Sequence, residues 1–154
     1  MHNYQTITFT KTCKVKTPAK ASPAEAGIDF YIPDGFQTTT LKPQERILIP
    51  AGIKLILPEH TCLLMTNKSG VASKKGLDVL ACCIDETYRG EIHINLVNTG
   101  TEDVVLEAGD KIVQGILHDL PDIQMLLVSP EEYERHPMFK TVRGAGGFGH
   151  TGDK

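Results

Sequence analysis

The chain has 154 residues, a formal net charge of -3 and a pI of about 6.0. This length fits one domain with a substantial core, and the slightly acidic balance excludes general binding to a nucleic-acid backbone. No apolar run approaches the ~20 residues of a membrane span, and residues 1–10 lack the features of a signal peptide. We expect a soluble, cytoplasmic protein with neither nucleic acid nor membrane as partner.

Short strand-like segments follow one another along most of the chain. Residues 91–96 alternate between polar and apolar types, which is the period of a half-buried strand. Turn signals such as Pro33-Asp-Gly35 and Ala108-Gly-Asp110 recur about every ten residues. The pattern predicts an all-β fold, a sandwich or jelly-roll type barrel, with strands at 5–9, 28–32, 46–49, 53–57, 62–66, 91–97, 104–106, 111–117 and 123–128.

Helical signals are scarce. Ser129-Pro-Glu-Glu132 is a capping box with proline at the first helical position, and Pro137 is expected to end that one short helix. Residues 68–75 are compatible with a further short turn. With no internal repeat and no linker, the sequence predicts a single β domain at 1–140 and a flexible glycine-rich arm at 141–154.

The four cysteines suggest a reducing compartment. Cys62, Cys82 and Cys83 could be combined with His60 into a zinc site, but their spacing differs from that of usual zinc ligand pairs. Free cysteines that act as small core residues are the favoured interpretation.

Residues 81–98 place chemically active side chains at the end of an apolar run. Asp85 closes that run, and Tyr88 and Arg89 lie on the following turn. A carboxylate, a phenol and a guanidinium at a strand end are suited to hold and activate a polar substrate. The alternative is that Asp85 only caps a tight turn, as aspartate often does.

The C-terminal residues differ in kind from the rest of the chain. Five glycines occur in the ten residues from Arg143 to Gly152, and glycine loses the most backbone entropy on ordering. One interpretation is a disordered tail. The other is a segment that orders over a bound ligand, with backbone N–H groups, Arg143 and Thr151 near phosphate and Phe148 stacked on a base.

Five motifs in this order resemble those of the homotrimeric dUTPases, a family of deoxyuridine triphosphate nucleotidohydrolases. Each motif alone is a weak signal, but together they extend from Ala26 to Gly152. They are Ala26-Gly-Ile-Asp-Phe30, Lys68-Ser-Gly-Val-Ala72, Ile84-Asp-Glu-Thr-Tyr-Arg-Gly90, Gly109-Asp-Lys-Ile-Val-Gln114 and the glycine-rich tail.

The resemblance implies a β-clip version of the jelly-roll fold and an activity, hydrolysis of dUTP to dUMP and pyrophosphate. Such an activity keeps uracil out of DNA and supplies dUMP for dTMP synthesis. Asp85 resembles the general base that activates the water attacking the α-phosphorus. Tyr88 resembles the residue whose ring packs under the deoxyribose and leaves no room for a 2′-hydroxyl.

The same resemblance implies the remaining substrate contacts. A hairpin over residues 77–84 would read uracil, largely with main-chain groups, and its contact residues would be Leu77, Asp78, Val79, Ala81, Cys82 and Ile84. The phosphate contacts of the core would be Lys68, Ser69, Gly70 and Gln114. The tail would close over the nucleotide with Arg143, Gly147, Phe148, Gly149, His150 and Thr151, the Phe148 ring lying over the uracil.

Mg²⁺ is the cofactor that the resemblance implies. It would be carried mainly by the triphosphate and by waters, as this ion usually keeps much of its hydration. Asp29 either reaches those waters or is a structural turn residue. In the family each site uses residues of three subunits, so the resemblance also implies a homotrimer whose tails cross to neighbouring subunits.

This chain departs from the family pattern at three positions. Lys68 stands where arginine is usual, which keeps the charge and loses the bidentate fork. Thr87 replaces an acidic residue before Tyr88, and His150 replaces a hydroxyl residue in the tail. None of the three removes a residue that the chemistry requires.

Two other functions remain as alternatives. The dCTP deaminases resemble dUTPases, but their catalytic glutamate corresponds to Asn95 here, and an amide is no general acid or base. A binding or signalling protein that retains a nucleotide pocket is the second alternative. The sequence does not distinguish a cellular from a viral origin; for a viral protein the compartment would be the host cytoplasm.

Overall fold

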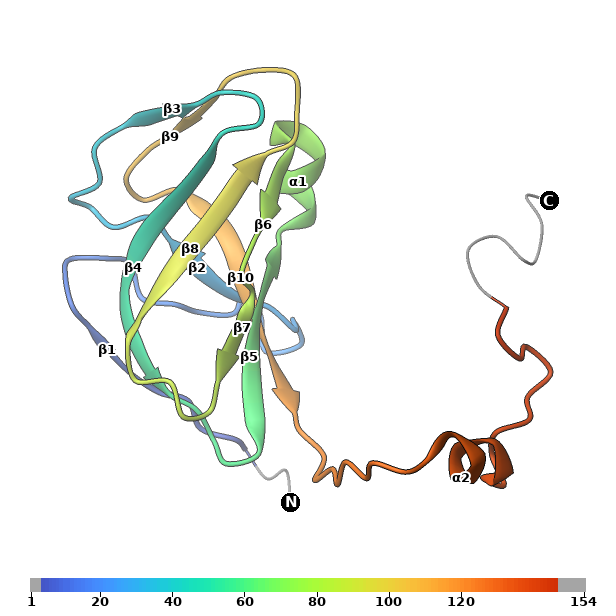
Figure 1. Ribbon diagram of the computed structural model, residues 1–154. Coiled ribbons are helices and arrows are strands. Elements are labelled where there is room, and N and C mark those ends of the chain that lie inside the picture. Colours follow the sequence, from blue (N-terminus) through green and yellow to red (C-terminus); the bar gives the residue numbers. More distant parts are fainter. Residues whose placement is uncertain (1–3, 147–154) are drawn as a thin grey trace. The chain divides into compact units, whose positions relative to one another are not determined.

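The computed structural model describes residues 4–146. The chain divides into two compact units, Met1–Pro121 and Asp122–Lys154. Every strand that the structure describes belongs to the first unit, the β-domain, and the described part of the second unit contains one short helix (Figure 1). No helix within residues 4–146 is long and apolar enough to cross a membrane.

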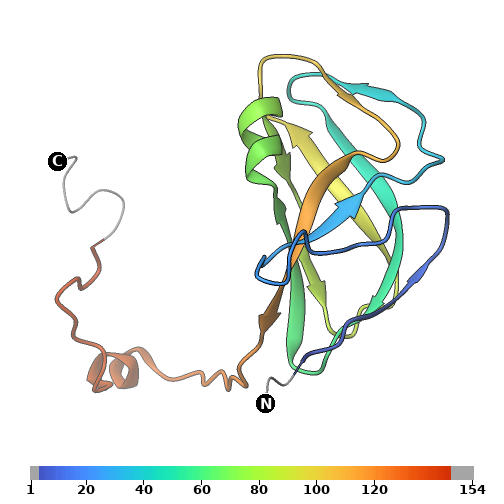
Figure 2. The ribbon, with the colours of Figure 1, turned by 180° about the vertical axis from the view of Figure 1, so that it is seen from behind.

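The β-domain is built from two four-stranded antiparallel sheets that face each other (Figures 1 and 2). The first sheet has the order β1 (Thr8–Lys11), β4 (Arg46–Ile56), β8 (Glu91–Asn98) and β6 (Leu77–Val79). The second has the order β2 (Ile28–Tyr31), β10 (Lys111–Asp119), β5 (Thr61–Asn67) and β7 (Cys83–Asp85). A ribbon of β3 (Thr39–Leu41) and β9 (Val104–Leu106) lies at one end.

The core lies between the sheets and follows from the alternation in the sequence. On β8, Ile92, Ile94 and Leu96 are buried, whereas His93 and Asn95 point to the other face. Ile94 pairs directly with the buried Ile49 of β4. Burying one such side chain contributes roughly 1.5–3 kcal/mol, so a strand of this pattern is stable only when its apolar face meets a second layer.

The predicted strands at 46–49 and 53–57 are a single strand, β4. It continues through Pro50-Ala51-Gly52, and its register against β8 shifts between Pro50 and Lys54. A proline is tolerated inside a sheet where the ladder is irregular, and Gly52 adopts a φ of 70° that disfavours other residues. The turn signal thus marks a bulge and not a loop.

The structure confirms the all-β class but corrects three details. Residues 4–146 contain two short helices and not one, α1 (Ser69–Lys75) and α2 (Pro130–Arg135). The capping box predicted for α2 is present, with Ser129 and Glu132 bonded to each other's backbone N–H groups. The sheets do not close into a barrel, and β3 was not predicted.

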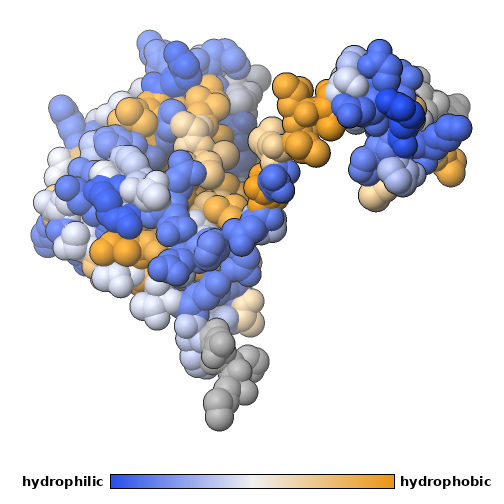
Figure 3. Space-filling model, turned by 60° about the horizontal axis from the view of Figure 1, so that its bottom comes forward, coloured by the Kyte–Doolittle hydropathy of each residue, from blue (hydrophilic) through white to orange (hydrophobic). Residues whose placement is uncertain are grey.

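The prediction of a strand at residues 123–128 is wrong. This exposed apolar segment has no regular structure, and Ile123, Met125, Leu126 and Leu127 are between 78% and 97% exposed. Apolar side chains appear along this stretch in Figure 3. An apolar segment of this length forms a strand only beside a partner with free hydrogen-bonding groups and apolar surface, and residues 123–128 pair with no described strand.

Candidate active site

A pocket of about 200 Å³ opens beside Asp85, the last residue of β7. Asp85 is exposed and pairs across the ladder with Cys62 at the start of β5. Of the predicted substrate residues, Ala81, Ile84 and Tyr88 line this Asp85 pocket with it. Its other lining residues are Leu48, Met65, Cys83, Glu91, Ile92, His93 and Asn95.

Tyr88 reaches the pocket through a tight turn. Its backbone N–H donates to the carbonyl of Asp85 at 3.0 Å, and its hydroxyl donates to the carbonyl of Glu91 at 2.8 Å. The ring is 45% exposed. The main-chain carbonyl of Asp85 closes this turn, and the Asp85 carboxylate lines the same pocket as the accessible Tyr88 ring.

Cys83 lies next to the Asp85 carboxylate. Its thiol donates to Asp85 Oδ1 with an Sγ–Oδ1 distance of 3.8 Å. Partial desolvation, the neighbouring Cys62 and the Asp85 charge all raise the pKa of the Cys83 thiol. The group therefore stays protonated, and it gives Asp85 a weak neutral donor without adding a second negative charge to the pocket.

The segment 77–84 is not the hairpin that was expected. β6 pairs with β8 in one sheet, and β7 pairs with β5 in the other. The residues between them cross from sheet to sheet, with Ala81 at a φ of 50°. Leu77 is buried, Asp78 accepts a bond from Asn67, and Leu77, Asp78, Val79 and Cys82 do not line the pocket. Only Ala81 and Ile84 of this group do.

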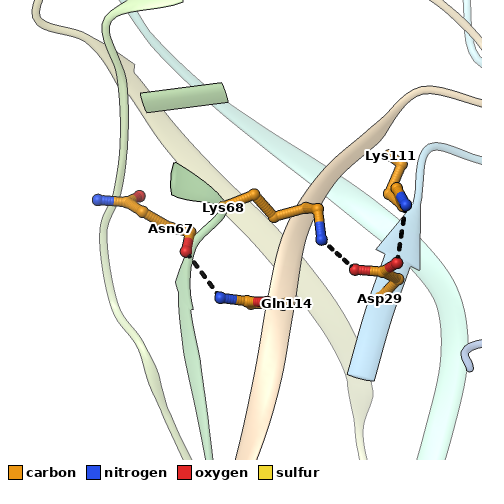
Figure 4. Close-up of polar contacts among 5 residues, drawn as sticks. All are labelled: Asp29, Asn67, Lys68, Lys111 and Gln114. Carbon is orange, nitrogen blue, oxygen red and sulfur yellow. Dashed lines mark hydrogen bonds and ion pairs between the residues drawn. The ribbon is translucent and has the colours of Figure 1, made fainter. Parts of the chain in front are cut away.

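A second polar group, the lysine cluster, consists of Asp29, Lys68 and Lys111 (Figure 4). Asp29 on β2 is buried, and its two oxygens pair with Lys68 Nζ and, at 2.9 Å, with Lys111 Nζ. Burial alone would raise the pKa of Asp29, but the hydrogen bonds and charges of the two lysines outweigh it and lower that pKa below its ordinary value. Asp29 likewise raises the pKa of Lys111. Lys111 was not predicted as a site residue.

Gln114 lies beside the lysine cluster. It faces Asp29 across the β2–β10 ladder, and its side-chain amide donates to the carbonyl of Asn67 at 3.0 Å (Figure 4). A side chain at Gly27 would collide with it, since a Cβ there would lie 2.2 Å from Gln114 Oε1. Asn67 directly precedes Lys68, and the exposed Ser69 and Gly70 begin α1. The predicted phosphate residues of the core therefore lie together.

Asp85 and Lys68 lie beside opposite ends of β5. Asp85 pairs with Cys62, whereas Lys68 follows Asn67. These two β5 residues are five positions apart, a rise of roughly 16 Å at about 3.3 Å per residue. One chain therefore does not bring the expected base and the expected phosphate residues of the core into a single site.

The expected tail contacts lie mostly beyond the described part of the chain. Arg143 is exposed, and its side chain donates to the carbonyl of Gly146 at 2.7 Å. Gly147, Phe148, Gly149, His150 and Thr151 are outside the described residues.

The positions of the possible metal ligands in residues 4–146 can be compared with the two metal hypotheses, a zinc site around Cys62 and a Mg²⁺ ion on the triphosphate. Among these residues, no three His, Cys, Asp or Glu side chains converge in a way that would hold a metal ion, and this includes the zinc combination around Cys62. A Mg²⁺ ion that is held by substrate phosphates and water needs no such protein cage. The described residues are compatible with a Mg²⁺ ion that is held in this way. Asp29 is the carboxylate that contacts Lys68, one of the predicted phosphate residues. Both oxygens of Asp29 contact lysines.

Solved structures define the fold class. The Staphylococcus bacteriophage 80alpha dUTPase with dUPNHPP is similar with a TM-score of 0.81 and 23% identity, covering 96% of this chain and 98% of that one. The dUTPase D95N mutant from phage phi11 of S. aureus, described with a structural Mg(II) ion, has a TM-score of 0.73 at 22% identity and covers 80% and 96%. The chain thus shares the all-β fold of these proteins.

Sequence comparisons give the family. The dUTPase family profile matches residues 13–152. The deoxyuridine 5'-triphosphate nucleotidohydrolase of Clostridium novyi (strain NT) is 40% identical over 141 residues, 90% of this chain and 92% of that protein. The protein of the same name from Paramecium bursaria Chlorella virus 1 is 36% identical over 138 residues, 88% and 89% of the two chains. The chain belongs to the dUTPase family.

Proposed function

We propose that this protein is a dUTP diphosphatase that hydrolyses dUTP to dUMP and pyrophosphate. Membership of the dUTPase family supports this activity. The observation that carries it is the placement of the Asp85 carboxylate and the Tyr88 ring in one pocket, joined by the turn hydrogen bond. A base and a sugar platform are the two groups that this reaction needs closest to the α-phosphate.

In the proposed mechanism, Asp85 removes a proton from a water molecule. The water oxygen forms a bond to the α-phosphorus, and the bond from that phosphorus to the bridging oxygen of the β-phosphate breaks, so that pyrophosphate leaves. General-base catalysis of this kind contributes roughly 10²–10⁴-fold. The Cys83 thiol, 3.8 Å from Asp85 Oδ1, stays neutral and so does not compete for the proton.

The base and sugar are read by separate parts of the pocket. Uracil lies by the main chain of the crossover segment that contains Ala81 and Ile84. A backbone N–H directed at uracil O4 would face an amino group in cytosine, and one buried unsatisfied donor costs about 1–3 kcal/mol. The Tyr88 ring lies under the deoxyribose and excludes a 2′-hydroxyl.

The triphosphate is held by the core phosphate residues together with the tail. Lys68, Ser69, Gly70 and Gln114 provide the core contacts, and Arg143 approaches the terminal phosphates. Lys68 reaches phosphate by exchanging its contact with Asp29. The tail residues Gly147, Phe148, Gly149, His150 and Thr151 close over the nucleotide, with Phe148 on the uracil.

Mg²⁺ would be held mainly by the triphosphate oxygens and water, and Asp29 is the residue of this chain that would reach it through a water. When bound, the ion neutralises phosphate charge and makes pyrophosphate a better leaving group. Both oxygens of Asp29 pair with lysines, so Asp29 would reach a hydrated Mg²⁺ only when one of these lysine contacts is exchanged for phosphate.

The active form is a homotrimer with sites shared between subunits. Two features of the single chain support this assembly. Asp85 and Lys68 lie beside opposite ends of β5, so a complete site needs Asp85 of one copy beside the lysine cluster of another. The exposed apolar segment at 123–128 is also of the kind that associates with another surface.

The proposed boundaries are a β domain at 1–140 and a mobile arm at 141–154, and the proposed compartment is the cytoplasm. There the reaction would keep uracil out of DNA and provide dUMP for dTMP synthesis. Asn95 lies in the Asp85 pocket, and its amide cannot act as the acid or base of a deaminase.

The test is release of pyrophosphate from dUTP, UTP, dCTP and dTTP in the presence of Mg²⁺, with ammonia release from dCTP followed in parallel. Rapid turnover of dUTP alone is the expected result. Comparable turnover of any of the other three, or ammonia from dCTP, would overturn the assignment. Tight binding of dUTP without turnover would identify a binding protein.

A further inference from the structure

The position of the Tyr88 ring is set by the two residues that follow Arg89. The Tyr88 hydroxyl donates to the main-chain carbonyl of Glu91 at 2.8 Å. On its way there the ring passes directly over Gly90, where an added Cβ would lie 2.3 Å from the Tyr88 hydroxyl oxygen and 2.5 Å from Cζ. A Cβ does not approach non-bonded heavy atoms this closely, so this ring position requires the absence of a side chain at Gly90.

Hydrogen bonds of the Glu91 side chain and a contact of its carbonyl with His93 fix the position of Glu91, whose carbonyl accepts the Tyr88 hydroxyl. The Glu91 carboxylate accepts hydrogen bonds from the Gly52 N–H at 2.7 Å and the Thr12 hydroxyl at 3.1 Å. These bonds tie the start of β8 to the bulge of β4. His93 Nδ1 also lies 3.0 Å from the Glu91 carbonyl. A carbonyl only accepts, so the tautomer with the proton on Nδ1 is the one that donates to this oxygen.

We propose that Gly90 and Glu91 form a seat for the Tyr88 ring and so determine discrimination between deoxyribose and ribose. This inference rests on the proposed function. The Tyr88 ring excludes a 2′-hydroxyl only while its distance from the sugar is fixed. A Tyr88 side chain that changes rotamer would leave space for the additional oxygen of ribose. Gly90 and Glu91 are thus positioning residues that act through Tyr88, and the carboxylate of Glu91 fixes the seat to the opposite strand.

Gly90→Ala tests the seat with little risk to the fold. Gly90 is not among the glycines with positive φ, so alanine is compatible with its backbone. The atoms that the new Cβ would meet belong to the end of the Tyr88 side chain, which can rotate away. We expect the ratio of kcat/KM for dUTP to kcat/KM for UTP to fall at least about tenfold, mainly through improved use of UTP.

Gly35→Ala is the matched control. Gly35 also has no positive φ, and an added Cβ there meets nothing within 4 Å. This variant should keep the wild-type ratio. Thermal unfolding of both alanine variants should follow that of the wild type, which shows that any change in Gly90→Ala is local to the ring.

Tyr88→Phe gives a second and independent measurement. It keeps the ring and removes only the bond to the Glu91 carbonyl, and a bond of this kind contributes about 0.5–1.5 kcal/mol. The dUTP/UTP ratio should therefore fall roughly 2- to 12-fold. In the double variant Gly90→Ala with Tyr88→Phe, the ratio should equal that of Gly90→Ala alone, because the displaced ring has already lost the bond.

The outcomes separate this inference from the proposed function. A wild-type protein that does not hydrolyse dUTP contradicts the function itself. A wild-type protein that prefers dUTP, with an unchanged ratio in folded Gly90→Ala and in Tyr88→Phe, overturns the seat alone. If Gly90→Ala does not fold, the ratio of Tyr88→Phe decides.

Discussion

The β-domain and the C-terminal unit both contain many apolar residues, but these residues have different surroundings. In the β-domain, residues such as Ile49, Ile94 and Leu106 are almost fully buried between the sheets. In the C-terminal unit, no described residue is buried, and Leu127 is 97% exposed. The two units are therefore stabilised differently, although both contain apolar segments of strand length.

This difference assigns separate tasks to the two units. The β-domain forms the Asp85 pocket and the lysine cluster with its own hydrogen bonds and core. The described C-terminal unit has a capped helix and an edge-to-face contact between Tyr133 and Phe139, with ring centroids 5.3 Å apart, but no core. A segment without a core orders stably only when a ligand or another chain covers it. The following predictions test this division.

The largest effect is expected from Asp85→Asn in the β-domain. The amide keeps the shape of the side chain and cannot accept a proton, so kcat should fall by roughly 10²–10⁴-fold. Affinity for a non-hydrolysable dUTP analogue should change by less than about tenfold. Single-turnover rates and calorimetric binding measure both quantities. A near-native rate would show that Asp85 is not the base.

Truncation after Val142 should separate catalysis from folding. Removing the tail leaves the β-domain core intact, so the melting temperature should remain close to that of the full chain. Without the groups that order the triphosphate and exclude water, kcat should fall by roughly 100-fold or more. The truncated protein is assayed for pyrophosphate release and for thermal unfolding. Unfolding of the truncated protein, or normal turnover, would contradict the division of tasks.

Charges in the exposed apolar segment should disrupt the oligomer. Leu126 and Leu127 are 78% and 97% exposed in the single chain, and changing both to glutamate would bury two unpaired carboxylates if another copy covers them. We expect dissociation of the trimer in sedimentation equilibrium. Val142→Glu, at another fully exposed apolar position, is the control and should keep the wild-type mass. Equal masses for all three proteins would refute coverage of this segment.

Asp29→Asn should have the smallest effect, on stability and its pH dependence. Loss of the carboxylate leaves Lys68 and Lys111 without their anion, so the free energy of unfolding at neutral pH should fall by about 1–3 kcal/mol. The folded-state pKa of Asp29 is lowered. Its contribution is therefore complete above the unfolded-state pKa and disappears as the pH falls through the folded-state value.

The measurement is urea unfolding of wild type and Asp29→Asn at one protein concentration, at neutral and at strongly acidic pH. The difference between the two proteins should shrink in acid. Asp34→Asn is the control, because its pair with Lys14, at 3.0 Å, is largely exposed and should contribute less than about 1 kcal/mol. A difference that stays constant with pH would mean that Asp29 stabilises the protein by packing and not by charge.

Local features of the protein were determined by the sequence alone. The alternation on β8 predicted which residues are buried, because the two faces of a strand differ by a period of two. The capping box predicted α2, since all its hydrogen bonds lie within four residues. The proximity of Asp85 and Tyr88 was predictable for the same reason, as a single turn joins them.

Features that depend on distant partners were decided only by the tertiary structure. Residues 77–79 and 83–85 resemble the arms of a hairpin, yet each pairs with a different sheet because β8 and β5 provide the free edges. Lys111 approaches Asp29 only because β10 pairs with β2. The segment at 123–128 has the length and the apolar composition of a strand and does not form one, because a strand needs hydrogen-bonding and apolar partners that no pattern in its own residues specifies.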